Sequence, residues 1–124
     1  ELSQNIKYGW DPKESYYNDL DLTSLFAKKH DLENFETFNL LSQNLNKFEN
    51  IDLVMSFLSV GFHYPISEYL DTLLNITSSD ATMIFGVRKG AVNLKDFKKY
   101  FNKIIIEKNT VDSKEELLIL KGKK

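Results

Sequence analysis

His63 is the residue of this chain that is best suited to proton transfer. Imidazole titrates near neutral pH, so a histidine can take a proton from a hydroxyl group under physiological conditions. His63 lies between Gly61 and Pro65, after an apolar run, and this pattern predicts a loop. We expect it either to act as a general base or to fix the loop by hydrogen bonding. Its neighbour Tyr64 is expected to line a pocket or to pack on the helix that begins at Pro65.

Two cations follow a second apolar run. Arg88 and Lys89 end the segment Ala81–Val87 and precede Gly90. They could bind an anionic group of a substrate, or they could form a solvated strand end. A metal site is not expected, because the chain has no cysteine and only two histidines, His30 and His63, which are far apart in sequence.

The elements that must position these side chains are predicted from hydrophobic periodicity. The nearly unbroken apolar run Ile51–Leu58 predicts a central strand buried on both faces of a parallel sheet. Further strands are predicted at Ile6–Trp10, Phe35–Leu40, Ala81–Val87, Lys103–Glu107 and Glu116–Leu120. Helices are predicted from Ser15 to His30, from Pro65 to Leu74, and from Asn93 to Phe101.

Strands and helices alternate, and two strands then close the chain. This order predicts one α/β domain over residues 1–124, with a Rossmann-like, doubly wound, mostly parallel sheet that carries helices on both faces. The closing pair predicts an antiparallel β-hairpin at the edge of that sheet.

The composition narrows the class of protein. Hydrophobic residues make up 42% of the 124 residues, which is enough for a packed core. The net charge is −2, and Lys and Arg are dispersed along the chain, so no nucleic-acid partner is expected. No apolar run approaches the roughly 20 residues that span a bilayer. We therefore expect a cytoplasmic protein without a membrane partner; its oligomeric state stays open.

Several segments resemble motifs of the class I S-adenosylmethionine-dependent methyltransferases. Residues 6–11 (IKYGWD) resemble the second strand of that family, which ends in an acidic residue. Residues 38–41 (FNLL) resemble the end of its third strand, and residues 51–56 (IDLVMS) resemble its fourth-strand motif. The segments 82–87 and 104–120 resemble its fifth strand and its final hairpin.

The resemblance implies a methyltransferase with S-adenosylmethionine as cofactor and a small-molecule or sugar-like acceptor. Asp11, with Trp10, would bind the ribose hydroxyls, although Asp11 also suits a turn before Pro12. Asn39, with Leu40, would reach the adenine, or Asn39 would only cap a strand end. Ser56 would face the cofactor or satisfy local backbone groups.

The sequence departs from the family in one respect. The first strand and its glycine-rich turn are missing, because no G-x-G spacing occurs among the five glycines. We expect the domain to be N-terminally incomplete, to be rearranged around residues 6–10, or to receive the strand from a partner chain. Two other possibilities stay open: a non-catalytic binding or assembly module with a degenerate methyltransferase fold, and a flavodoxin-like doubly wound domain.

Overall fold

The chain divides into two compact units, residues 1–43 and residues 44–124. The computed structural model describes residues 20–39, 42–57, 59–108 and 114–124. The predicted strand Ile6–Trp10 and the start of the predicted helix at Ser15 lie outside these residues. Each unit is described by itself.

The first unit contains the helix α1, Leu20–Lys29. Asp21 lies in its first turn and Lys28 and Lys29 in its last, which suits the helix dipole. The predicted helix up to His30 is thus confirmed over its described part. The predicted strand Phe35–Leu40 is wrong over residues 35–39, which adopt neither helix nor strand. A strand needs a neighbour for its backbone hydrogen bonds, and residues 20–39 contain none.

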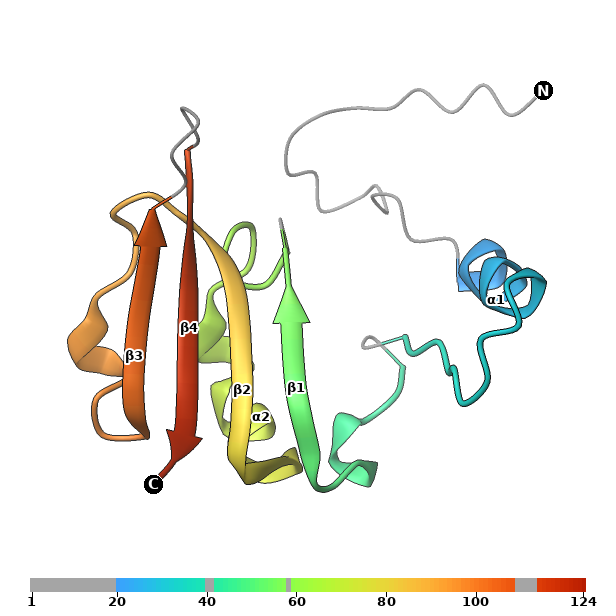
Figure 1. The fold of residues 1–124 in the computed structure, drawn as a ribbon, viewed down its shortest axis with the longest axis horizontal. Helices are drawn as coiled ribbons and strands as arrows, with labels where there is room; N and C mark the ends of the chain where they lie inside the picture. The colour runs from blue at the N-terminus through green and yellow to red at the C-terminus, as the bar shows by residue number, and fades with distance from the viewer. Residues whose placement is uncertain (1–19, 40–41, 58, 109–113) are drawn as a thin grey trace. The chain divides into compact units, whose positions relative to one another are not determined.

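The second unit is built on a four-stranded sheet (Figure 1). Its strands are β1 (Ile51–Ser56), β2 (Thr77–Arg88), β3 (Phe101–Lys108) and β4 (Glu115–Lys123). Their order across the sheet is β1-β2-β4-β3. Strand β1 pairs parallel with β2, whereas β4 pairs antiparallel with both β2 and β3. The four predicted strands of this part of the chain are confirmed, with longer bounds for three of them.

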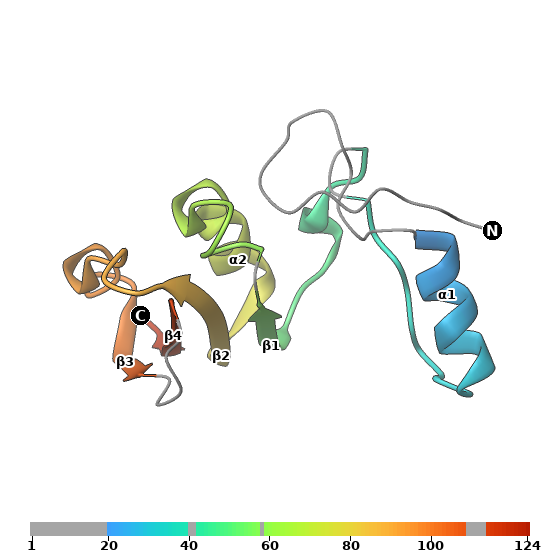
Figure 2. The same cartoon turned by 90° about the horizontal axis from the view of Figure 1, so that it is seen from above.

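The prediction of a doubly wound, mostly parallel, Rossmann-like methyltransferase sheet is wrong. One of the three pairings in the described sheet is parallel, and the helical segments that connect its strands lie on one face of it (Figure 2). The physical reason is the position of β4: it inserts between β2 and β3 and runs antiparallel to both, so β2 and β3 point the same way without pairing, and β1–β2 is left as the one parallel pair of the described sheet. The hairpin β3–β4 is confirmed, but β3 forms the edge and β4 lies inside.

The prediction that Ile51–Leu58 is a central strand buried on both faces is also wrong. Strand β1 lies at the edge of the described sheet, and its residues Leu53 and Met55 are exposed. An apolar sequence shows that a strand can be buried, but it does not show what covers each face.

The connection from β1 to β2 carries the helix α2, Leu70–Ile76, which follows the short 3-10 helix η2, Ile66–Glu68. This confirms the helix predicted after Pro65. The C-terminal end of α2 is held by Lys123 of β4, whose Nζ donates hydrogen bonds of 2.7 Å to the carbonyl oxygens of Leu74 and Thr77. These bonds satisfy carbonyls that the helix itself leaves unpaired.

The helix predicted after Asn93 is reduced to the 3-10 helix η3, Leu94–Asp96. The Asn93 side chain does cap it, accepting a hydrogen bond of 3.1 Å from the backbone N–H of Lys95. Phe97 and Phe101 reach the core from the turn that follows and from the start of β3.

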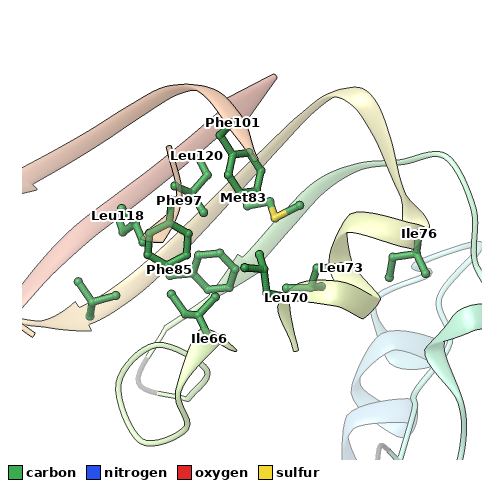
Figure 3. Packing of buried hydrophobic residues seen from close by; sticks show 11 residues of the cluster. Ile66, Leu70, Leu73, Ile76, Met83, Phe85, Phe97, Phe101, Leu118 and Leu120 are labelled. Atoms are coloured by element: carbon green, nitrogen blue, oxygen red, sulfur yellow. The ribbon is translucent and has the colours of Figure 1, made fainter. Parts of the chain in front are cut away.

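The hydrophobic core lies between the sheet and the helical layer formed by α2, η2 and the segment around η3 (Figure 3). Met83, Phe85 and Val87 alternate along β2 and are fully buried, as are Leu118 and Leu120 of β4. Ile66, Leu70 and Leu73 cover them from the helical side. Burial on one face of each strand therefore gives the sheet a packed face and a second, open face.

Candidate functional site

The loop of residues 59–64 follows β1, at the carboxyl end of the parallel pair β1–β2. It is a tight turn in which the carbonyl oxygen of Ser59 accepts backbone hydrogen bonds from Phe62, His63 and Tyr64, at 3.0, 2.7 and 3.1 Å. The backbone N–H of Gly61 donates a hydrogen bond of 2.7 Å to the carbonyl of Tyr64. These bonds fix the backbone that carries His63.

The loop lies against β2 at Gly61. The φ of Gly61 is +99°, a region that disfavours residues with a side chain. A β-carbon at Gly61 would lie 3.1 Å from the carbonyl oxygen of Gly86 and 3.2 Å from both Phe85 Cβ and Val87 Cγ1. The close approach of two backbones therefore requires glycine at this position.

Arg88, the last residue of β2, holds the other side of the loop. Its Nε donates a hydrogen bond of 3.2 Å to the carbonyl oxygen of Phe62, and its guanidinium carbon lies 4.8 Å from the centre of the Phe62 ring. The Phe62 ring in turn meets His63 edge to face, with 5.1 Å between ring centres. Arg88 is thus an exposed strand end, which is one of the two alternatives that the sequence offered, and it also contacts the loop.

His63 and Tyr64 are both exposed at the surface of the loop. Ser56, the last residue of β1, is half-buried and pairs in register with Phe85 of β2. Lys89 is exposed in the turn after β2. The structure therefore brings four predicted site residues to one end of the sheet: Ser56, His63, Tyr64 and Arg88, with Lys89 next to Arg88 in the chain.

Glu116 is a residue of this region that the sequence analysis missed. It is buried, and its Oε2 accepts a hydrogen bond of 3.1 Å from the backbone N–H of Gly90. The bond holds the turn after β2, which also carries Lys89. The alternation of side chains along a strand could have predicted this burial. Glu116 shares its face of β4 with Leu118 and Leu120, so it must point into the core.

Within the described part of the chain, the structure does not bring together the residues that the family resemblance assigns to the cofactor. Asp11, Trp10 and Leu40 lie outside the described part of the chain. Asn39 belongs to the first unit, where its backbone N–H donates a hydrogen bond of 2.9 Å to Gln43 Oε1. Of the residues assigned to the cofactor, Ser56 is the one that the structure describes in the sheet unit.

Within the described ranges, no group of three or more His, Asp or Glu side chains could hold a metal ion. Among the helices that the structure describes, none combines the length and the apolar character that crossing a bilayer requires.

Comparison with known proteins finds no match to this chain, either among protein-family models or among curated proteins.

Proposed function

We propose that this chain takes part in S-adenosylmethionine-dependent methyl transfer to a small-molecule or sugar-like acceptor. In this proposal the loop of residues 59–64 holds the acceptor. The observation that carries it is the placement of His63 and Tyr64 on a loop that Gly61 and Arg88 hold against the carboxyl end of β2. The carboxyl ends of parallel strands are where open α/β sheets bind their ligands.

Each side chain has a stated role in this proposal. Bound S-adenosylmethionine would supply the methyl group, and His63 would take the proton that an acceptor hydroxyl loses when it is methylated. Tyr64 lines the acceptor site, and the exposed Lys89 binds an anionic group of the acceptor. Arg88 positions the loop through the bond from its Nε to Phe62, and its remaining N–H groups, like Lys89, offer donors to an anionic group of the acceptor.

The cofactor side of the proposal rests on the family resemblance alone, which implies a set of cofactor residues: Asp11, Trp10, Asn39, Leu40 and Ser56. Of these, the sheet unit contains Ser56, and one half-buried hydroxyl does not make a cofactor site. What supports the proposal within the sheet unit is therefore the acceptor loop, residues 59–64.

Backbone NMR spectra of the full chain with S-adenosylhomocysteine, a stable product of such a reaction, test the proposal. We expect millimolar ligand to shift the amide signals of residues that the resemblance assigns to the cofactor, namely Asp11, Asn39 and Ser56. His63→Ala is expected to leave this binding intact and to abolish methyl transfer to a hydroxyl acceptor. His30→Ala is the matched control, since His30 lies in the first unit, where its ring contacts that of Phe26 with ring centres 4.3 Å apart. Unchanged spectra with either S-adenosylhomocysteine or S-adenosylmethionine would contradict the proposal.

The second candidate function is a non-catalytic binding or assembly module. The exposed apolar side chains of β1 favour it, since Leu53 and Met55 lie on the face of the sheet that has no helical cover. This function predicts no response to either sulfonium or thioether ligand, together with association through the open face. The NMR experiment therefore separates the two candidates.

A further inference from the structure

The face of the sheet opposite α2 carries a continuous apolar row. The pairing register places Met55, Ile84, Ile119 and Ile105 side by side, one from each strand. None of the four belongs to the core on the helical side. The flanking positions Leu53 and Leu117 on the same face are apolar as well. We call this set, with Phe57 after β1, the open face.

The open face is exposed most strongly along β1. Leu53, Met55 and Phe57 are 50%, 58% and 54% exposed, whereas the isoleucines of the inner strands are half-buried between their neighbours. Contiguous exposed apolar side chains of this kind mark interaction surfaces in proteins. The strand that carries them is also an edge strand, with one row of backbone groups outside the described sheet.

Charged residues of opposite sign lie on the two sides of the apolar row on β3. On one side, Lys103 pairs directly with Lys121 of β4. On the other side, Glu107 pairs with Leu117, and one step further along β4 Glu115 pairs with Arg88 of β2. On β3 the order on this face is therefore Lys103, Ile105, Glu107.

We propose that the open face binds a second copy of this chain, face to face, about a twofold axis that runs along the apolar row. Such an axis lies across the strands and reverses their direction. It places Ile105 against its own counterpart and brings Lys103 of each copy opposite Glu107 of the other. A twofold axis along the strands would instead place lysine-bearing ends together, which charge repulsion disfavours.

The charge pattern is what selects a second copy as the occupant. A surface in which a cation and an anion stand equally far on either side of an apolar centre is complementary to itself, as an isologous interface requires. Two sheets packed in this way lie about 10 Å apart, which allows Lys and Glu side chains from facing strands to meet.

The area of the open face determines the affinity that we expect for the dimer. Four strands at about 4.8 Å spacing and three residue steps of about 6.7 Å along one face span roughly 400 Å² in projection. Side-chain relief raises the accessible area toward roughly 600 Å² per partner, the lower end of specific interfaces. We therefore expect a dimer with a dissociation constant in the micromolar range. This inference does not depend on the proposed function, and its test uses no ligand.

Sedimentation velocity of the full chain, from about 1 to 100 µM, tests the dimer. We expect the average mass to rise with concentration toward twice 14.4 kDa. Met55→Glu should weaken association by at least about tenfold, because it puts a charge in the apolar row. Leu25→Glu is the matched control: Leu25 is equally exposed, at 58%, but lies on α1, so association should stay unchanged. Circular dichroism shows that each variant is folded.

A charge exchange tests the orientation of the two copies. Lys103→Glu and Glu107→Lys should each dimerise more weakly alone, whereas an equimolar mixture of the two variants should associate at least as well as the unmodified chain. That result requires residue 103 of one copy to face residue 107 of the other. An unmodified chain that stays monomeric over the whole concentration range overturns the proposal and leaves the open face to a different partner. Dimers that persist in Met55→Glu, or a mixture no stronger than its components, overturn it as well.

Discussion

The carboxylate of Glu115 in β4 occupies the space above Gly86 in β2. A β-carbon on Gly86 would clash with Glu115 Oε1 and would lie 3.1 Å from Glu115 Cδ and 3.5 Å from the Cα of Phe57. The two residues are diagonal neighbours, since Gly86 pairs with Leu117 and Arg88 pairs with Glu115. Glycine at position 86 therefore lets the end of β1 and the carboxylate of β4 approach the same point of β2.

This relationship predicts a coupled pair of substitutions. Gly86→Ala should destabilise the fold by about 1–3 kcal/mol, because the added methyl group must displace the carboxylate or the backbone at Phe57. In Glu115→Ala the same Gly86→Ala change should cost less, by about 1 kcal/mol, because one obstacle is gone. Urea unfolding of the four variants measures this. Equal costs in the two backgrounds would show that the side chain of Glu115 does not occupy this space.

Gly61 and Gly90 give a matched comparison for the loop after β1. Gly61→Ala should cost about 2–4 kcal/mol, because the new β-carbon meets the strand β2 in a backbone conformation that already disfavours it. Gly90 also has a positive φ, +71°, but open space surrounds its missing side chain, so Gly90→Ala should cost about 1 kcal/mol. Thermal unfolding at a common pH distinguishes them. Similar losses at both sites would argue against contact between the loop and β2.

The two faces of the sheet should respond differently to loss of a phenyl ring. Phe85 is fully buried among Met83, Leu118 and the helical layer, so Phe85→Ala should destabilise by about 3–5 kcal/mol. Phe57→Ala removes a ring that is more than half exposed, and its cost should stay below about 1 kcal/mol. Denaturant midpoints at low micromolar protein measure both. A large loss at Phe57 under these conditions would mean that the ring is buried within one chain.

Lys123 is expected to stabilise the fold through its two hydrogen bonds to the end of α2. Lys123→Met keeps the aliphatic stem but leaves the carbonyls of Leu74 and Thr77 without this donor, at a cost of about 1–3 kcal/mol. Lys108→Met, at the exposed end of β3, serves as the control and should change stability by less than about 0.5 kcal/mol. Hydrogen exchange should also speed up in α2 of the Lys123 variant alone. Unchanged exchange there would contradict the capping role.

Within the sheet unit, the sequence was sufficient to predict where the four described strands form, because apolar alternation and turn residues are local signals. Strands β2 and β4 show this: Met83, Phe85 and Val87 alternate, as do Leu118 and Leu120. The arrangement of those strands was not predicted. Whether β4 lies outside β3 or between β2 and β3 depends on pairings between distant segments, and local periodicity carries no information about them.

The candidate site was predicted in the same partial way. Gly61 and Pro65 predicted a loop around His63, and the structure has a tight turn there. The hydrogen bond from Arg88 to Phe62 joins residues 26 positions apart, and no local sequence pattern predicts it. The helix predicted after Asn93 failed because its apolar residues Phe97 and Phe101 fill the core from a turn and a strand, which gives a similar spacing without a helix.

The position of β4 has a consequence for how the chain acquires its structure. In the described sheet β3 pairs with β4 alone, and β4 is the later of the two in sequence. During synthesis on the ribosome, β1, α2 and β2 can associate before β4 has been made. At that stage β3 has no strand to pair with, and its residues Ile104 and Ile106 are exposed to solvent. When β4 enters between β2 and β3, it pairs with both strands and so joins β3 to the rest of the described sheet. Folding of this unit should therefore be a late, single event, and the interval before it is when the nascent chain is most prone to aggregate.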